Sequence, residues 1–319
     1  MFNSTHTLVG LVMARAGLDR KAPGATATAV IASNLPDIDI VTQFFGTATY
    51  LELHRGITHT LVGIPVLSLL LAGLMSLRNR KSPDRPAGVF KNLFTVALAV
   101  MLTHPLLDWA NTYGVRPFAP FSGRWYYGDL LFVIDPYLDS ILLASLLLSY
   151  RLFRRHRAVA VLGLVTAAAY GAGMLQLRTT ARLRLSEFAL RLPAASVWAV
   201  SPHFLDPFQW SGFVVQPGET RVVTIDTRTG EVRGQTTMET AADSAVTRAV
   251  ESSYAARVFR GFARFPITRV SRTESGYRVL MMDLRFYRPP SRTALSAEFL
   301  VDDDLRITAE SISFVRPVD

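Results

Sequence analysis

Uncharged apolar stretches alternate with short charged ones along the first half of the chain. Residues 58–77 and 158–177 contain no charged side chain, and each has about the 20 residues that a helix needs to cross a bilayer. Residues 92–107 form a shorter apolar run, and residues 130–150 carry two aspartates in their first half. An acidic side chain inside a span is itself a sign of a functional site, so we predict about four spans.

The N-terminal region contains two further apolar runs, residues 7–18 and 22–35, which are short and rich in alanine and glycine. We predict two short helices here, tilted or half-inserted. We expect no secretory signal peptide, because the N-terminus lacks a basic leader. Residues 1–178 are therefore predicted to form an α-helical integral membrane domain.

The pattern changes after residue 192 to short alternating segments separated by turn residues. Residues 241–262 have helical periodicity. We predict a soluble α+β domain over residues 193–319, joined to the membrane domain by a linker at 179–192. The expected strands are 213–216, 220–226, 231–234, 268–273, 277–287, 294–301 and 307–315.

Composition agrees with a membrane protein. Half of the residues are apolar and 18% are charged, below the roughly 25% of soluble domains. The basic excess lies in the apolar half, which has 16 basic and 9 acidic residues. We therefore expect no nucleic-acid partner. The chain has no cysteine, so a metal must be held by histidine, aspartate or glutamate.

Basic clusters at residues 15–21, 78–91 and 151–157 predict the orientation, because positive loops stay in the cytoplasm. Alternation then puts residues 34–59 and 111–129 at the outer face. The soluble domain is expected on the same, periplasmic side.

Several candidate ligands lie in these outer segments. Asp37 and Asp39 follow Pro36, and in an extended backbone their side chains point the same way, as a metal site requires. The alternative is a pair of aspartates that cap the next helix.

His54 and His59 are five residues apart around Gly56, a spacing that suits a bend better than one face of a straight helix. Thr58 is placed to cap the helix or to orient an imidazole. The guanidinium of Arg55 is a candidate for binding an oxyanion or phosphate through two N–H donors at once. The alternative is a pair of histidines at the membrane interface.

His104 and Asp108 are four residues apart, hence on one helix face, where they share a metal or one orients the other. The alternative for such a histidine is a satisfied core residue. Asp135 completes the set. The candidates all fall at the outer ends of their segments: His6, Asp37, Asp39, His54, His59, His104, Asp108 and Asp135.

Imidazoles and carboxylates without thiolates suit Zn²⁺, with Mn²⁺ as an alternative, and this set is large enough for one or two ions. The predicted chemistry is hydrolysis of a phosphoester by a metal-activated water. Asp37, His59, His104 and Asp108 would hold metal, while Arg55 would stabilise oxyanion charge and Asp39 would act as general base, with His54 beside them.

The order of these motifs resembles the bacterial inner-membrane metal-dependent hydrolase family, over about residues 1–180. The His-Arg-Gly-Ile-Thr-His element at 54–59 is its most specific part. That family's pattern is similar to the zinc-dependent phospholipase C and single-strand nuclease superfamily. The resemblance implies a multi-pass protein of the bacterial inner membrane. The metal ligands that it implies are His6, Asp37, His59, His104, Asp108 and Asp135, with Asp39 and His54 as ligands or close neighbours.

We therefore expect a membrane-bound hydrolase that acts on a phospholipid or another amphiphilic phosphoester at the outer leaflet. Its partners would be the lipid bilayer and this substrate. The alternatives are a transport or scaffold protein with an ion path through the membrane, and a metal sensor.

Overall fold

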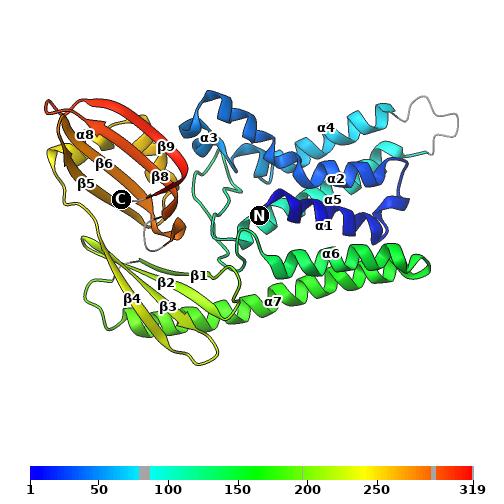
Figure 1. Ribbon diagram of the computed structural model, residues 1–319. Helices are drawn as coiled ribbons and strands as arrows, with labels where there is room; N and C mark the ends of the chain where they lie inside the picture. Colours follow the sequence, from blue (N-terminus) through cyan, green and yellow to red (C-terminus); the bar gives the residue numbers. More distant parts are fainter. Residues whose placement is uncertain (79–86, 196, 289–291, 318–319) are drawn as a thin grey trace. The chain divides into compact units, whose positions relative to one another are not determined.

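The computed structural model describes residues 1–78, 87–195, 197–288 and 292–317. The chain divides into two compact units (Figure 1). Arg80, Lys81 and Arg85, which belong to one of the basic clusters, lie outside the described residues. Unit 1 comprises Met1–Asp39, Arg55–Leu177 and Pro202–Pro207, and unit 2 comprises Ile40–His54, Arg178–Ser201 and Phe208–Asp319.

Unit 1 is helical, as the apolar runs predict. Its two N-terminal helices, α1 and α2, occupy the two short runs at the start of the chain. Its helices are α1 (Asn3–Arg15), α2 (Ala25–Asn34), α4 (Gly63–Arg78), α5 (Val89–Ala110), α6 (Pro136–Arg151) and the first two thirds of α7 (His156–Ala189). Short 3₁₀ helices add η1 (Leu18–Arg20), the start of η2 (Leu35–Phe45), η3 (Ile57–His59) and η4 (Phe153–Arg155).

Two helical segments in the described part of the chain are long and apolar enough to cross a membrane: Val89–Ala110 and Phe153–Ala189. A third span results if the broken pair Thr47–His59 and Gly63–Arg78 acts as one. Helix α6 has 16 residues, slightly fewer than the roughly 17 to 25 of most spanning helices. Unit 1 thus has two or three candidate spans.

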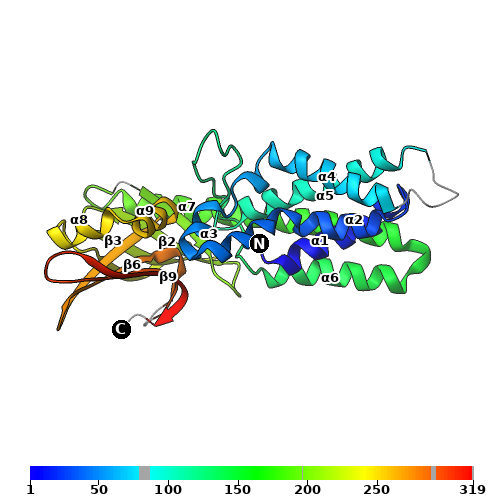
Figure 2. The ribbon, with the colours of Figure 1, turned by 90° about the horizontal axis from the view of Figure 1, so that it is seen from above.

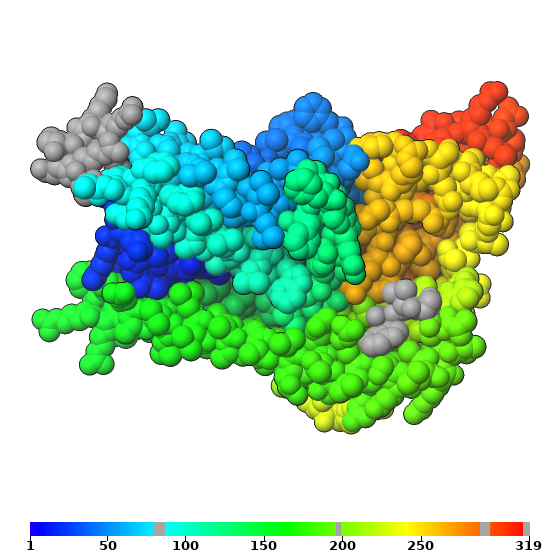
Figure 3. Space-filling view, turned by 180° about the vertical axis from the view of Figure 1, so that it is seen from behind, coloured from blue at the N-terminus to red at the C-terminus, as the bar shows by residue number. Residues whose placement is uncertain are grey.

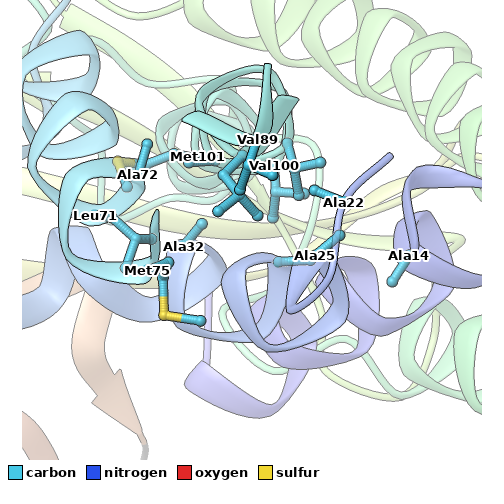
Figure 4. Packing of buried hydrophobic residues seen from close by; sticks show 14 of the residues in the cluster. Ala14, Ala22, Ala25, Ala32, Leu71, Ala72, Met75, Val89, Val100 and Met101 are labelled. Atoms are coloured by element: carbon cyan, nitrogen blue, oxygen red, sulfur yellow. The ribbon is translucent and has the colours of Figure 1, made fainter. Parts of the chain in front are cut away.

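Small side chains bring the helices of unit 1 together. Ala25, Ala29 and Ala32 of α2 are buried in the cluster that contains Val96 and Ala97 of α5 (Figure 4). Small residues let helix backbones approach closely, which is the usual packing device where lipid removes the hydrophobic driving force. Figure 2 shows α1, α2, α4 and α5 side by side, with α6 next to α1.

The basic segments of unit 1 meet at one end of the helices. Arg15 donates to the Ser149 carbonyl oxygen at 2.9 Å, and Arg157 Nε donates to the Ala16 carbonyl oxygen at 3.0 Å. The Asn92 amide donates to the Lys21 carbonyl oxygen at 2.9 Å. Along α5 this end is about 24 Å from Asp108, at 1.5 Å per residue. The charge asymmetry of the sequence therefore separates a basic end from the end that carries the candidate ligands.

Unit 2 consists of two antiparallel sheets and short helices. One sheet has the order β1-β2-β3-β4, and in the other β5, β6, β8 and β7 follow one another with β9 paired to β8. The ring of Phe213 stacks on that of Phe265 at 4.8 Å in the core. The strands are β1 (Val197–Pro202), β2 (Gln209–Gln216), β3 (Glu219–Asp226), β4 (Val232–Glu239), β5 (Pro266–Thr273), β6 (Gly276–Asp283), β7 (Tyr287–Arg288), β8 (Arg292–Val301) and β9 (Ile307–Pro317).

The helices of unit 2 differ from the sequence prediction in two ways. The segment predicted as a linker at 179–192 is helical as far as Ala189, because α7 continues through it. The single helix predicted at 241–262 is two helices, α8 (Ala245–Glu251) and α9 (Tyr254–Phe262). Ser253 separates them, because its hydroxyl accepts from the Ala256 N–H and starts a new helix. A further helix of this unit, α3 (Thr47–Leu53), packs against α9 and β9.

Candidate metal centre

The buried face of α5 leads from the helical core directly to the candidate ligands. Leu93, Val100, His104 and Asp108 follow one another at helical spacing, and each is fully buried. Pro105 lies inside the same helix, with its ring taking the place of one backbone N–H. The residues that hold the core together therefore also position one imidazole and one carboxylate.

Four side chains converge at this end of α5: Asp37, His59, His104 and Asp108. His59 Nε2 is 3.2 Å from His104 Nε2, 3.3 Å from Asp37 Oδ1 and 3.4 Å from Asp108 Oδ2. His104 Nε2 is 3.4 Å from Asp37 Oδ1 and 3.3 Å from Asp108 Oδ2. The described part of the chain thus brings together four residues that the sequence predicted as ligands.

These separations are those of ligands around one ion. Tetrahedral ligand bonds of about 2.0 to 2.2 Å put the ligand atoms about 3.3 to 3.6 Å apart. Five of the six distances in the group fall between 3.2 and 3.4 Å, and all six are below 4.8 Å. The side chains therefore already have the spacing that a divalent cation requires.

Both imidazoles are oriented by a hydrogen bond at Nδ1, the ring nitrogen that does not face the other ligands. His104 Nδ1 lies 2.7 Å from the Ser33 carbonyl oxygen, which only accepts, so Nδ1 carries the proton and Nε2 has a free lone pair. Thr58 Oγ1 donates to Asp39 Oδ2 at 3.3 Å and therefore accepts from His59 Nδ1, 3.0 Å away. Each histidine thus presents its Nε2 lone pair to the shared centre.

The two aspartates after Pro36 have different positions. Their backbone is the 3₁₀ helix η2, whereas the sequence interpretation considered a turn with an extended backbone. At about three residues per turn, side chains two residues apart diverge, although one oxygen of Asp37 and one of Asp39 still lie within 4.8 Å of each other. Asp37 faces the imidazoles, while Asp39 Oδ2 accepts from the Arg55 backbone N–H at 2.9 Å and from Thr58.

Replacing Asp39 with alanine is expected to lower metal affinity about 10- to 100-fold, the usual cost of losing an outer hydrogen-bond partner. The substitution removes the acceptor that fixes Thr58 and, through it, His59. Metal titration of the purified variant measures this change. Asp19→Ala, in η1, is the matched control and should leave the affinity unchanged. An unchanged affinity in Asp39→Ala would contradict the orienting role.

Arg55 lies beside the four-residue group. Its Nη2 is 2.8 Å from Asp108 Oδ1, and Nη1 donates to the Gly114 carbonyl oxygen at 2.9 Å. The guanidinium lies over the Tyr113 ring at 4.4 Å. The backbone of Arg55 is left-handed, with φ of 54°, which is uncommon outside glycine. The bend between His54 and His59 therefore occurs at Arg55 itself, next to Gly56.

The other predicted residues lie around this group or outside it. His6 is buried, with its ring stacked on His104 at 3.7 Å and its Nε2 3.6 Å from Asp108 Oδ1. Burial lowers the pKa of His6 to about 4, so its imidazole is neutral at physiological pH. His6 is a close neighbour of the four ligands and is not one of the converging group.

Asp135 and His54 have local structural contacts. Asp135 caps α6, where its carboxylate accepts from the backbone N–H groups of Tyr137 and Leu138 and from the Tyr170 hydroxyl at 3.0 Å. His54 belongs to unit 2, where it ends α3 and its ring stacks on Tyr50 at 4.7 Å. The metal role of Asp135, the catalytic role of His54 and the general-base role of Asp39 stay predictions.

The groups at the site that sequence reasoning missed include the Ser33 carbonyl oxygen and the Asn111 side chain. Asn111 is fully buried, and its Oδ1 accepts from the Tyr113 backbone N–H at 2.8 Å and lies 3.5 Å from Arg55 Nη1. Its position three residues after Asp108, directly after the end of α5, was the available signal. No pattern in the sequence indicates the Ser33 carbonyl, because any residue type offers one.

Comparison with known proteins gives a family for the same part of the chain. The model of the YdjM inner membrane protein family matches residues 1–180. The chain belongs to this family. The matched residues include all four converging side chains of this chain. The family description is that of an inner membrane protein and mentions no activity.

One curated relative is the uncharacterized protein YfhP of Bacillus subtilis (strain 168). It is 27% identical over 158 residues, which cover 47% of this chain and 46% of the relative. The match thus spans about half the length of each protein. No solved structure matches the chain.

Proposed function

We propose that this protein is a metal-dependent hydrolase that cleaves a phosphoester at the membrane surface. The observation that carries the proposal is the convergence of two histidine Nε2 atoms and two carboxylate oxygens at 3.2 to 3.4 Å. The description of the YdjM family names an inner membrane protein and no activity, so the proposed activity rests on this geometry.

The donors fit a cation. Two Nε2 lone pairs and two carboxylates repel one another unless a positive charge lies among them. Within the described part of the chain, Asp108 Oδ2 is buried and receives no hydrogen bond, as expected of an oxygen that binds a metal. Two imidazoles and two carboxylates suit Zn²⁺, with Mn²⁺ as the alternative. We propose one ion at this group.

The chain supplies the remaining requirements of hydrolysis. A divalent ion held here would lower the pKa of a bound water and polarise a phosphoryl oxygen. Arg55 orients Asp108 and adds positive charge where oxyanion charge develops. Asp37 is 17% exposed, whereas His59, His104 and Asp108 are inaccessible, so substrate and water approach from the side of Asp37.

The loop that follows α5 supports an amphiphilic substrate. Arg116 lies over the Trp125 ring at 4.6 Å, and Arg124 lies over the Tyr126 ring at 5.4 Å. Phe121, in the same loop, is 87% exposed. Tryptophan, tyrosine and arginine together are typical of the boundary between lipid and water. The loop stands out from the helices in Figure 2 and Figure 3, and it begins at Asn111, next to the site.

We further propose that α4 and α6 join α5 and α7 in the bilayer, giving four spans. Both helices have outward-facing apolar side chains, including Leu70 and Leu74 on α4 and Leu147 on α6, which are more than half exposed. Such faces suit contact with lipid. The basic end of unit 1 would then be cytoplasmic, and the site would face the periplasm together with unit 2.

An ion path is less well supported, because it requires polar side chains through the depth of the membrane. The buried face of α5 is apolar from Leu93 to Met101, and its polar residues occur only at the His104 end. Polar residues that are gathered at one end of α5 suit a reaction at the membrane surface.

Turnover measured on the full-length protein in detergent tests the proposed function. Bis(4-nitrophenyl) phosphate serves as soluble substrate and phospholipid vesicles as lipid substrate. Chelation should abolish turnover, and added Zn²⁺ or Mn²⁺ should restore it. Purified protein that neither contains nor binds a divalent ion would contradict the proposal. Metal binding without turnover of either substrate would favour a sensor.

A further inference from the structure

Two buried hydrogen-bond donors beside the candidate metal centre have no acceptor among the described residues. They are Arg55 Nε and Asn111 Nδ2. The Arg55 residue is 4% exposed and Asn111 is fully buried. Buried donors almost always have a partner, so an unpaired pair next to a candidate site needs an explanation.

The other polar atoms of both side chains are already fixed. Arg55 Nη1 and Nη2 bind the Gly114 carbonyl and Asp108, and the guanidinium stacks on Tyr113. Asn111 Oδ1 accepts from the Tyr113 N–H. A flipped amide would put its NH₂ group against that N–H, so the orientation with Nδ2 unpaired is determined by the backbone.

The missing partner must be an acceptor. A metal ion cannot satisfy an N–H group, whereas an oxyanion satisfies both donors and complements the charge of the guanidinium. Asp108 connects this pair to the metal centre, because its Oδ1 binds Arg55 while its Oδ2 belongs to the converging group. An anion on Arg55 and Asn111 would therefore lie next to the ion.

We infer that Arg55 and Asn111 form an oxyanion site that holds a phosphoryl oxygen of the substrate beside the metal. The inference rests on the proposed function for the identity of the substrate, and it adds Asn111 as a binding residue. The phosphoryl group can come from a lipid headgroup or from free phosphate, and the two probes below distinguish these sources.

The test measures binding of inorganic phosphate and of a short-chain phosphatidic acid to metal-loaded, full-length protein in detergent, by calorimetry. Asn111→Asp keeps the acceptor for Tyr113 but replaces the donor with a negative charge. We expect phosphate affinity to fall at least 10-fold, with metal content unchanged. The control is Asn92→Asp, whose amide donates to the Lys21 carbonyl at the opposite end of α5 and whose replacement should have no effect.

A second variant separates lost hydrogen bonding from added charge. Asn111→Ser is neutral and keeps an oxygen for the Tyr113 N–H, but its hydroxyl does not reach as far as the amide. It should also weaken phosphate binding and serves alone if Asn111→Asp does not fold.

Metal-loaded variants that bind both ligands like wild type would overturn the inference, because the two donors would then serve only an ordered water. Loss of phosphatidic acid binding alone would assign the site to a lipid headgroup, and equal loss of both would assign it to phosphate itself. A protein without metal would instead contradict the proposed function.

Discussion

Replacing His104 with alanine is expected to remove the divalent ion from the purified protein. His104 Nε2 lies within 3.4 Å of the other three ligand atoms. Its loss therefore leaves three metal ligands and one empty ligand position. The fall in affinity should exceed the about 10- to 100-fold that loss of an outer hydrogen-bond partner costs. Metal content by mass spectrometry and titration with Zn²⁺ measure it.

His156 offers the matched control for this experiment. It is a histidine at the start of α7, whose Nδ1 lies 2.7 Å from the Phe153 carbonyl oxygen among the basic residues at the other end of unit 1. His156→Ala should keep the wild-type metal content. Full metal occupancy in His104→Ala, or equal losses in the two variants, would show that the converging group is not the metal site.

The second large effect is expected for Arg55→Lys, which should reduce turnover about 100- to 1,000-fold at saturating metal, the usual cost of losing a donor to a developing oxyanion. A lysine ammonium cannot bind Asp108, the Gly114 carbonyl and a substrate oxygen at once with the planar geometry of the guanidinium. It also loses the stacking on Tyr113. Steady-state kinetics with the soluble phosphodiester measures the loss.

Arg15→Lys is a closely matched control. Arg15 also stacks on a tyrosine, with its guanidinium 4.5 Å from the centre of the Tyr150 ring, and it also donates to a backbone carbonyl, that of Ser149. Its position at the basic end predicts wild-type turnover. If Arg55→Lys retains metal and full turnover, the role of Arg55 is limited to packing.

The sequence was informative about the ligands because the membrane restricts where charge can lie. Histidine and aspartate at the ends of apolar runs are costly without a function, so His59, His104 and Asp108 could be predicted as candidate ligands. The helical spacing of His104 and Asp108 fixed their common face. Asp37 was predicted as a further candidate, although its backbone is a 3₁₀ helix and not an extended turn.

The contrast between Asp37 and Asp39 could not be derived from the sequence. Both are aspartates after one proline, and only the rise and turn of η2 directs one to the imidazoles and the other to Arg55 and Thr58. Asp135 illustrates the same limit. Its place at an outer helix end fits a ligand, but the N–H groups of α6 and the Tyr170 hydroxyl occupy its carboxylate.

The sequence by itself therefore determined that the first half is a helical membrane unit, that metal would be held by imidazole and carboxylate, and which end carries the site. These follow from hydropathy, the absence of cysteine and the distribution of charge, which are local properties. Only the tertiary structure decided which four side chains converge, which contacts orient them and which donors beside them lack a partner. These depend on the approach of α5, η2 and η3, which are distant in sequence and brought together by packing of small residues.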